Sequence, residues 1–195
     1  MIASSTVVVA LGCGDGSSAT GAASTGSGAD GGGGGASCHA CDEPEARGAV
    51  ANAGITEASG IVASKLHPGA YYVHNDSGDG ARFFAVDERG QDLGTFRLSG
   101  VTAIDWEDVA RGPCPDPAKS CLFFADFGDN DRVRSDYVIY RVEEPEVLGV
   151  GVVDVAFDAL RFRYADGARD AEALLAQPET GQLVIVTKDA SGSQA

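Results

Sequence analysis

Basic residues are scarce in this sequence of 195 residues. It holds 14 Lys and Arg against 29 Asp and Glu, which gives a formal net charge of −15. Such an acidic surface repels the phosphate backbone of nucleic acids and the anionic faces of membranes. We therefore expect no nucleic-acid partner, and cation binding is favoured, although most of these carboxylates serve solubility alone.

The motifs of common hydrolases are absent too. The sequence contains no Gly-x-Ser-x-Gly elbow and no His-Glu-x-x-His zinc motif. The run Gly31–Gly35 follows no strand, so it is not a phosphate-binding loop. His74, close to Asp76 and Asp79, is a candidate general base, but nothing in the sequence requires that role. Catalytic residues therefore stay unassigned.

The apolar run at the N-terminus, residues 1–12, is too short to span a bilayer but has the size of a signal-peptide core. It ends at Cys13, and Ala10-Leu11-Gly12-Cys13 resembles a bacterial lipobox, whose cysteine carries a diacylglycerol. Two features depart from that pattern, because Ala10 replaces the usual Leu and no Lys or Arg precedes Arg47. We expect a signal peptide over residues 1–13 and a lipid on Cys13. Ordinary secretion and an accidental apolar N-terminus are the alternatives.

Residues 14–50 are expected to form a disordered tether rich in Gly and Ser. Almost nothing in this segment can be buried, so it cannot offset the entropy cost of ordering. A flexible spacer behind a lipid-bearing cysteine holds a folded domain off a membrane. We expect the protein in the cell envelope or outside the cell, in contact with a membrane only through the lipid anchor. Its expected partner is an unknown ligand or a component of the cell envelope.

The four remaining cysteines form two close pairs. Cys38 and Cys41 are expected to form a local disulfide, with a metal site or a redox pair as alternatives. Cys114 and Cys121 flank a turn-rich loop, which a second disulfide would clamp. This pairing leaves no cysteine over once Cys13 is lipidated, as expected in an oxidising compartment.

Two short patterns recur in residues 51–195. An apolar strand runs into an acidic turn three times, and these copies align Asp76, Asp126 and Asp189 at intervals of about 50 and about 63 residues. A second pattern, an acidic strand opening, precedes each copy and aligns Glu57, Asp105 and Asp170. Periods of this size are typical of propeller blades, and chance similarity among short apolar runs is the alternative.

Strand-like runs rich in aromatic and β-branched residues fill each repeat. The expected strands are 59–64, 71–74, 82–87, 93–98, 107–111, 121–126, 137–142, 159–164, 171–176 and 182–188, with an additional run at 152–157. By propensity Ala171–Ala176 suits a helical turn equally well, and only the repeat favours a strand. The predicted fold is all-β, a partial β-propeller of about two and a half four-stranded blades. We expect it to be part of a longer propeller, with self-association as the alternative.

The first strand of each propeller blade lines the central channel, so acids that open these strands converge. The expected metal ligands are Asp105, Glu107, Asp108, Asp170 and Glu172. Oxygen ligands of this kind suit calcium or magnesium. The acidic turns add secondary metal candidates, Asp76, Asp79, Asp126 and Asp129, for which a structural turn role is the alternative.

The blade pattern resembles that of gluconolactonase and regucalcin-type propellers, in which a Glu-Gly-Pro segment opening an inner strand supplies a metal ligand. Ser59-Gly60-Ile61 stands at that place here, while Glu107 and Glu172 keep the acid. The pattern is also similar to that of β-propeller phytases, which bind calcium among acidic side chains. A closer likeness is to uncharacterised bacterial exported propellers with the segments seen at Asn75–Asp79 and Asp105–Asp108, which implies no established activity.

Two functions follow as hypotheses. The first is an exported, lipid-anchored propeller that binds an unknown ligand without catalysing a reaction. The second is a calcium-dependent hydrolase of the lactonase or phosphoesterase type, in which Asp105, Glu107 and Glu172 hold the ion that polarises the substrate. Calcium is the only cofactor expected.

Overall fold

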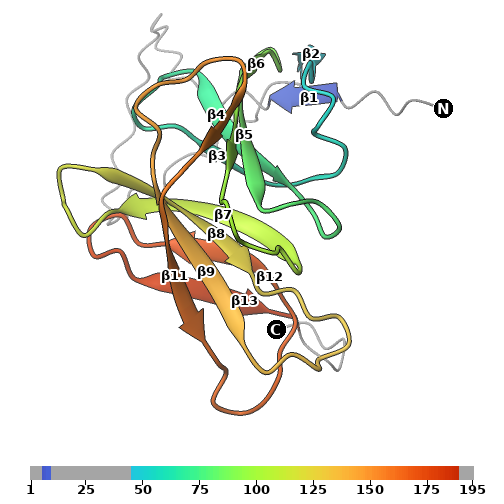
Figure 1. The fold of residues 1–195 in the computed structure, drawn as a ribbon, viewed down its shortest axis with the longest axis vertical. Coiled ribbons are helices and arrows are strands. Elements are labelled where there is room, and N and C mark those ends of the chain that lie inside the picture. The colour runs from blue at the N-terminus through green and yellow to red at the C-terminus, as the bar shows by residue number, and fades with distance from the viewer. Residues whose placement is uncertain (1–5, 10–44, 189–195) are drawn as a thin grey trace, which may run out of the picture.

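The computed structural model describes residues 6–9 and 45–188 (Figure 1). Every regular element in these residues is a β-strand and none is an α-helix, so the predicted all-β class is confirmed. No helix long and apolar enough to cross a membrane occurs in this part of the chain. Cys13, Cys38, Cys41 and Asp189 lie outside the described residues.

Two sheets share one plan, in which four antiparallel strands lie as hydrogen-bonded neighbours in the order of the sequence. The first sheet contains β3 (Ala58–Ala63), β4 (Ala70–Asn75), β5 (Arg82–Asp87) and β6 (Asp92–Arg97). The second contains β7 (Trp106–Pro113), β8 (Ser120–Asp126), β9 (Tyr137–Glu143) and β11 (Phe157–Phe162). Their bounds agree with the expected strands to within a few residues.

Two smaller sheets complete the described residues. β12 (Ala171–Ala176) pairs antiparallel with β13 (Leu183–Thr187), so the segment with equal helical propensity is a strand, as the repeat indicated. β1 (Thr6–Val9) pairs with β2 (Glu45–Ala49). β2 lies within the expected tether and β1 within the expected signal peptide. They pair because a Val-rich run readily forms hydrogen bonds with a second extended segment.

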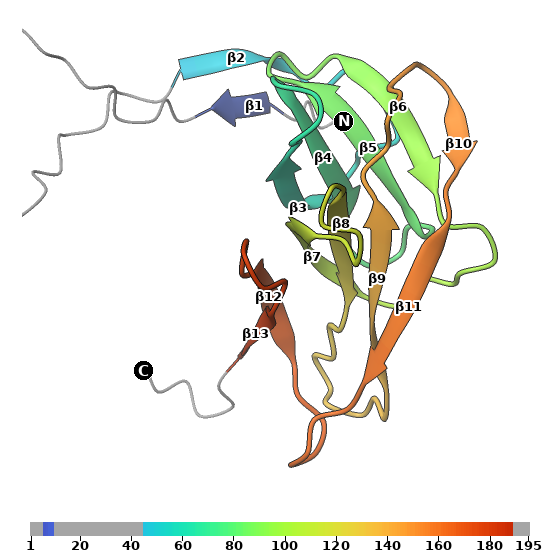
Figure 2. The same ribbon diagram turned by 90° about the vertical axis from the view of Figure 1, so that its left-hand side faces the viewer.

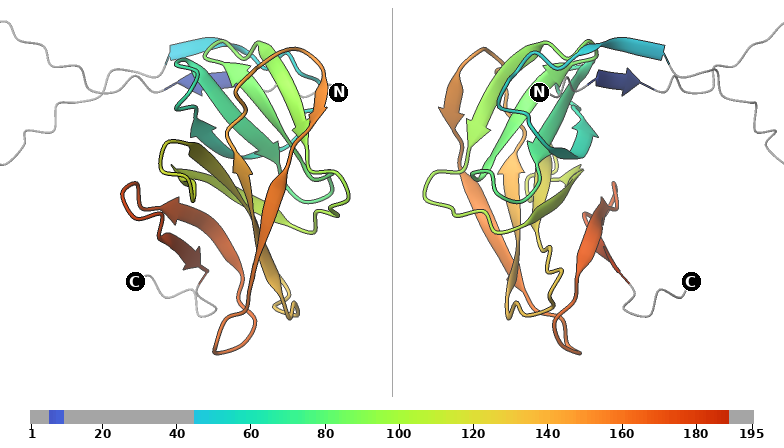
Figure 3. Two further views of the ribbon diagram at one scale, coloured as in Figure 1. Left: turned by 60° about the vertical axis from the view of Figure 1, so that its left-hand side comes forward. Right: turned by 90° about the vertical axis from the view of Figure 1, so that its right-hand side faces the viewer.

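The first strands of the three sheets, β3, β7 and β12, lie side by side in that order (Figure 2). Gly60 permits the close approach of β3 to β7, because a Cβ atom there would lie 2.3 Å from His74 Nε2 and 2.8 Å from Val109 N. The sheets follow one another along the molecule (Figure 3). The openings of β7 and β12 therefore come close together in space.

Side chains of β8 fill the space on both faces of the second sheet. Leu122 and Phe124 pack into one cluster with residues of the first sheet, and Phe123 and Ala125 pack into another with residues of β12. Because successive strand residues point to opposite faces, this uninterrupted apolar run serves two cores. Trp106 is buried in the first cluster and stacks on Phe124, with ring centroids 5.1 Å apart.

Hydrogen bonds confirm that the acidic openings occupy equivalent places. The carbonyl oxygens of Glu57, Asp105 and Asp170 each accept a bond from the backbone just past the next strand. The donors are the N–H groups of Asp76, Gly128 and Lys188, at 2.9, 3.2 and 2.8 Å. The ladder is also irregular near the start of β3, β7 and β12 alike. The three sheets are thus built on one repeated unit.

The alignment of the acidic turns differs by one residue from the expected alignment. Asn75 pairs with Ala58 as Asp126 pairs with Trp106, so Asn75, and not Asp76, occupies the position of Asp126. Asn75 Oδ1 and both Asp126 carboxylate oxygens also accept hydrogen bonds from backbone N–H groups just before the first strand. Asp76 is therefore free to face the neighbouring sheet.

The segment between β9 and β11 connects the first two sheets. β10 (Val152–Asp154), whose place the sequence did not fix, pairs parallel with β6. Glu144 is buried and accepts hydrogen bonds from Lys65 N at 2.9 Å and Leu66 N at 3.1 Å. The predicted disulfide between Cys114 and Cys121 is confirmed and closes the loop between β7 and β8.

Candidate metal centre

Carboxylates from three sheets meet where β7 and β12 begin. Asp76, Asp105 and Glu107 each offer an oxygen within 4.8 Å of the others. Glu107, Asp170 and Glu172 do the same. We call these two groups the first and second triad. Glu107 belongs to both, so all five acids form one cluster, which we call the acidic centre.

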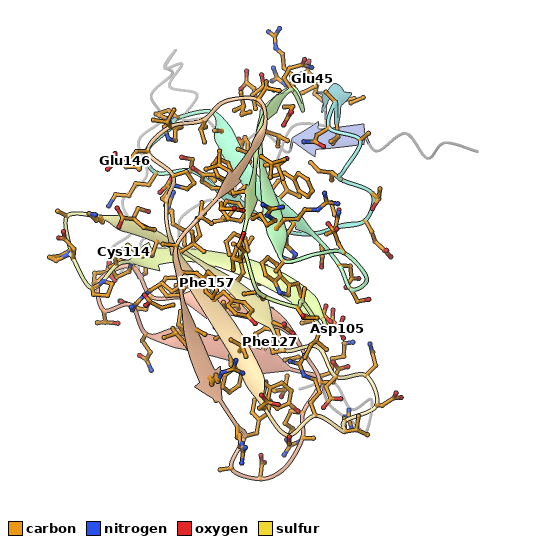
Figure 4. All side chains as sticks on the ribbon, viewed as in Figure 1. Glu45, Asp105, Cys114, Phe127, Glu146 and Phe157 are labelled. Atoms are coloured by element: carbon orange, nitrogen blue, oxygen red, sulfur yellow. A yellow bond between two sulfur atoms is a disulfide. The ribbon has the colours of Figure 1, made fainter. Side chains whose placement is uncertain are left out.

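Backbone contacts around Asp126 position the opening of β7. The Asp126 carboxylate accepts hydrogen bonds from the N–H groups of Ile104 and Asp105, both at 3.1 Å. Arg134 pairs with the same carboxylate at 2.9 Å and donates to the backbone oxygens of Asp126 and Gly128. These bonds hold the loop before β7 in place, and Figure 4 labels Asp105 at that end of the strand.

Gly128 forms the wall of the acidic centre. A Cβ atom at this position would lie 2.2 Å from Glu107 Oε1 and 2.4 Å from Asp105 Oδ2. A side chain at residue 128 would therefore force both carboxylates to move. The absence of a side chain at Gly128 leaves room for the two carboxylates.

The Glu107 side chain is the least solvated member of the first triad. The residue is 8% exposed. In the part of the chain that the structure describes, its carboxylate accepts no hydrogen bond and forms no ion pair. Burial, followed by repulsion from Glu172, Asp105 and Asp76, raises the pKa of Glu107 from 4.5 to about 8. The pKa of Asp105 is raised for the same reasons, burial first and then the charge of Asp76.

Lys188 neutralises part of the second triad. Its Nζ atom lies 2.9 Å from Asp170 Oδ2 and also pairs with Glu172. These contacts raise the pKa of Lys188, the hydrogen bond to Glu172 contributing most. Asp170 Oδ1 accepts the backbone N–H of Asp129 at 3.0 Å. Asp170 and Glu172 thus have a cationic partner, whereas Glu107, which belongs to both triads, has none among the described residues.

Asp108, another expected metal ligand, lies outside both triads. Its Oδ2 atom accepts the N–H of Leu174 at 2.7 Å, and Oδ1 accepts the N–H of Val109 at 2.8 Å. The side chain therefore joins β7 to β12. It points away from Glu107 because consecutive strand residues face opposite sides.

The secondary candidates divide into one acid at the centre and three structural acids. Asp76 joins the first triad. Asp79 accepts hydrogen bonds from Asn75 and Arg82. Asp129 accepts hydrogen bonds from Tyr137 OH at 2.9 Å and from two backbone N–H groups. With Asp126 bound to Arg134, three of the four acids support the surrounding loops.

His74 is fully buried, and its ring lies edge-on to Trp106 and Phe124. Its Nδ1 atom lies 2.8 Å from the carbonyl oxygen of Asn75. Burial lowers the pKa of this imidazole, which keeps it neutral. The candidate general base is therefore a packing residue of the core between the first two sheets.

Sequence reasoning missed Lys188 and Arg134 as parts of this region. Lys188 had a usable signal, since it lies at the end of the third apolar strand. In an antiparallel pair that end lies beside the start of the preceding strand, which carries Asp170 and Glu172. Arg134 had none, because it lies in the loop between β8 and β9, which neither recurring pattern includes. In comparisons with known protein families, curated proteins and solved structures the chain showed no match, so its function has to be argued from this geometry.

Proposed function

We propose that this chain is a β-propeller binding module whose acidic centre holds a divalent cation, calcium. The propeller assignment is supported by three features of the described residues. Each sheet runs outward from a first strand, the first strands lie side by side, and neighbouring sheets pack face to face. This is the plan of successive propeller blades. By this plan the sheets formed by β3–β6 and β7–β11 are two blades, and β12–β13 begin a third.

One observation carries the cation proposal: Glu107, a residue only 8% exposed, belongs to two triads of acids, and its carboxylate has no hydrogen-bond or ion-pair partner among the described residues. A largely buried carboxylate is costly when it is charged and has no partner, so it either holds a proton, as the raised pKa of Glu107 indicates, or is coordinated to a cation. A cation touching Asp76, Asp105 and Glu107 would remove their repulsion and supply the missing partner. Carboxylate oxygens from separate elements are ligands that calcium accepts in flexible geometry.

The first triad is the better position for the ion. In the part of the chain that the structure describes, no cationic side chain pairs with its members, whereas Lys188 already pairs with Asp170 and Glu172. An ion bound to these three carboxylates would have further coordination positions for water or for a ligand. A ligand bearing an oxygen donor could then bind by completing the coordination shell, which is the binding function we propose for the module.

Thermal unfolding with and without calcium tests this function. A cation that binds only the folded state stabilises it by about 2.7 kcal/mol at a hundredfold excess over its dissociation constant. We expect millimolar calcium to raise the melting temperature, and Glu107→Gln to remove most of that increase. Glu88→Gln is the matched control, since Glu88 lies in an exposed hairpin turn. Equal melting temperatures with and without calcium would refute the proposal.

The lipid anchor at Cys13 and export to the cell envelope stay predictions of the sequence. They are tested separately, by labelling bacteria that express the protein with a fatty-acid analogue. We expect incorporation that Cys13→Ser abolishes. Label that persists in this variant would rule out the anchor without affecting the cation proposal.

A further inference from the structure

A second candidate site lies where the inner strands end, away from the acidic centre. A cavity of about 360 Å³ opens there, and all three sheets contribute to its walls. Its charged lining residues are Lys65 after β3, Arg111 on β7, Lys119 before β8 and Glu179 in the turn between β12 and β13. Arg111 lies about 13 Å along β7 from Glu107. Figure 4 labels Asp105 and Cys114 just beyond the two ends of this strand.

Two of these cations have no carboxylate partner in the described residues. Most Lys and Arg side chains in the chain form ion pairs, as Lys119 does with Glu143 at 2.6 Å. Lys65 and Arg111 form none. In a protein of net charge −15, two unpaired cations at one cavity make a local exception to the acidic surface. The Glu179 carboxylate, the only acid among the lining residues, accepts a bond from the Gln177 side chain.

Hydrogen bonds hold the Arg111 side chain and the backbone at Lys65. Arg111 Nη1 donates to the carbonyl oxygen of Ala63 at 2.9 Å, which leaves the other guanidinium nitrogens available. The backbone at Lys65 is held by the buried Glu144 carboxylate, which also accepts a bond from Ser64 Oγ. A site held in this way loses less entropy when a ligand binds.

The rest of the wall is stiff and offers few competing donors. Pro113, Pro117 and Pro178 line it, and proline has no backbone N–H and a fixed φ. The loop that carries Pro117 and Lys119 is closed by the Cys114–Cys121 disulfide. The side chains of Lys65, Arg111 and Lys119 are therefore the cationic donors that a ligand meets.

We propose that this cavity binds an oxyanion group, phosphate or carboxylate, of a small ligand. A guanidinium offers paired N–H groups that match the oxygens of either anion, and a nearby ammonium adds a point charge. The volume is at the lower end of that of small-molecule pockets, which fits a compact ligand. This binding site is independent of the acidic centre and needs no metal ion.

Isothermal titration calorimetry on the full chain tests this site, with inorganic phosphate and succinate as separate probes. The protein is first stripped of metal with EDTA and then desalted, so that no cation at the acidic centre can bridge to the anion and no chelator carboxylate competes for the cavity. Sodium chloride keeps the ionic strength constant. We expect saturable binding of at least one probe. Arg111→Gln should weaken it at least tenfold and Lys65→Gln several-fold. The probe that binds more tightly identifies the anion group that the cavity prefers.

Arg89→Gln is the matched control, because Arg89 is exposed, forms no ion pair with another residue in 45–188 and lies in the turn between β5 and β6. It removes the same charge without touching the cavity, so binding should be unchanged. Circular dichroism confirms that each variant keeps its strand content. Absence of binding by both probes, or equal weakening by Arg89→Gln and Arg111→Gln, would overturn the proposal.

Discussion

Replacing Glu107 by Gln should change how the stability of the cation-free protein depends on pH. The pKa of Glu107 is about 8 in the folded protein against 4.5 for an unperturbed side chain. Between these values the folded state holds a proton that the unfolded state has released. The free energy of unfolding of the wild type should therefore fall as pH rises through this window. The stabilising contribution of the protonated side chain is present at low pH and is lost above about pH 8.

The size of this effect follows from the two pKa values. At about 1.4 kcal/mol for each tenfold change, raising the pH from about 5.5 to about 8.5 should cost the wild type about 3 kcal/mol relative to Glu107→Gln. For a protein of this length that difference corresponds to roughly 10 °C in melting temperature. Glutamine keeps the shape of the side chain, carries no proton to release and can donate to the neighbouring carboxylates.

The assay is urea unfolding in EDTA at a series of pH values, followed by circular dichroism. Glu88→Gln serves as the control for removal of one exposed carboxylate, and its curve should run parallel to that of the wild type. If the wild type and Glu107→Gln also run parallel across the whole range, Glu107 is ordinarily solvated, and the electrostatic argument for the acidic centre fails.

Three further predictions concern the supports of the centre and the fold. Gly128→Ala should destabilise the protein by about 1–3 kcal/mol, because its Cβ would collide with Glu107 and Asp105. It should also remove the increase in melting temperature that calcium causes. Melting curves should show no such loss for Gly80→Ala, where nothing lies within 4 Å of the added Cβ. Arg134→Met should cost about 3–5 kcal/mol by leaving Asp126 buried and unpaired, whereas Arg161→Met, at an exposed pair, should cost less than about 1 kcal/mol. Similar losses in urea unfolding for these two variants would contradict that reasoning. Replacing Cys114 and Cys121 together by Ser should lower the free energy of unfolding by about 2–3 kcal/mol, and an unchanged denaturation midpoint would show that the loop needs no clamp.

Much of the strand architecture could be predicted from the sequence, because strand signals are local. Aromatic and β-branched runs such as Leu122–Phe124 alternate with turns that contain Gly, and the backbone has few other ways to bury such runs. The recurrence of an acid at Glu57, Asp105 and Asp170 could also be recognised from the sequence. It placed these residues at equivalent positions, which their matching hydrogen bonds confirm.

The composition of the acidic centre was decided by the tertiary structure. Asp76 and Asp126 both follow an apolar strand and look alike in sequence, yet Asp76 joins Glu107 while Asp126 lies buried against Arg134. The difference is one residue of register, which turns a side chain to the opposite face of a strand. Asp108 points away from Glu107 for the same reason.

The sequence by itself determined the strands and the disulfide-bonded loop, which depend on residues close together in the chain, and the repeat and the acidic surface, which follow from recurring patterns and composition. Only the tertiary structure decided which charges meet. Lys188 reaches Asp170 and Glu172 because β13 returns beside β12, and Lys65 and Arg111 share a cavity because β3 and β7 end side by side. These encounters depend on how the sheets pack, and packing joins residues that no local pattern connects.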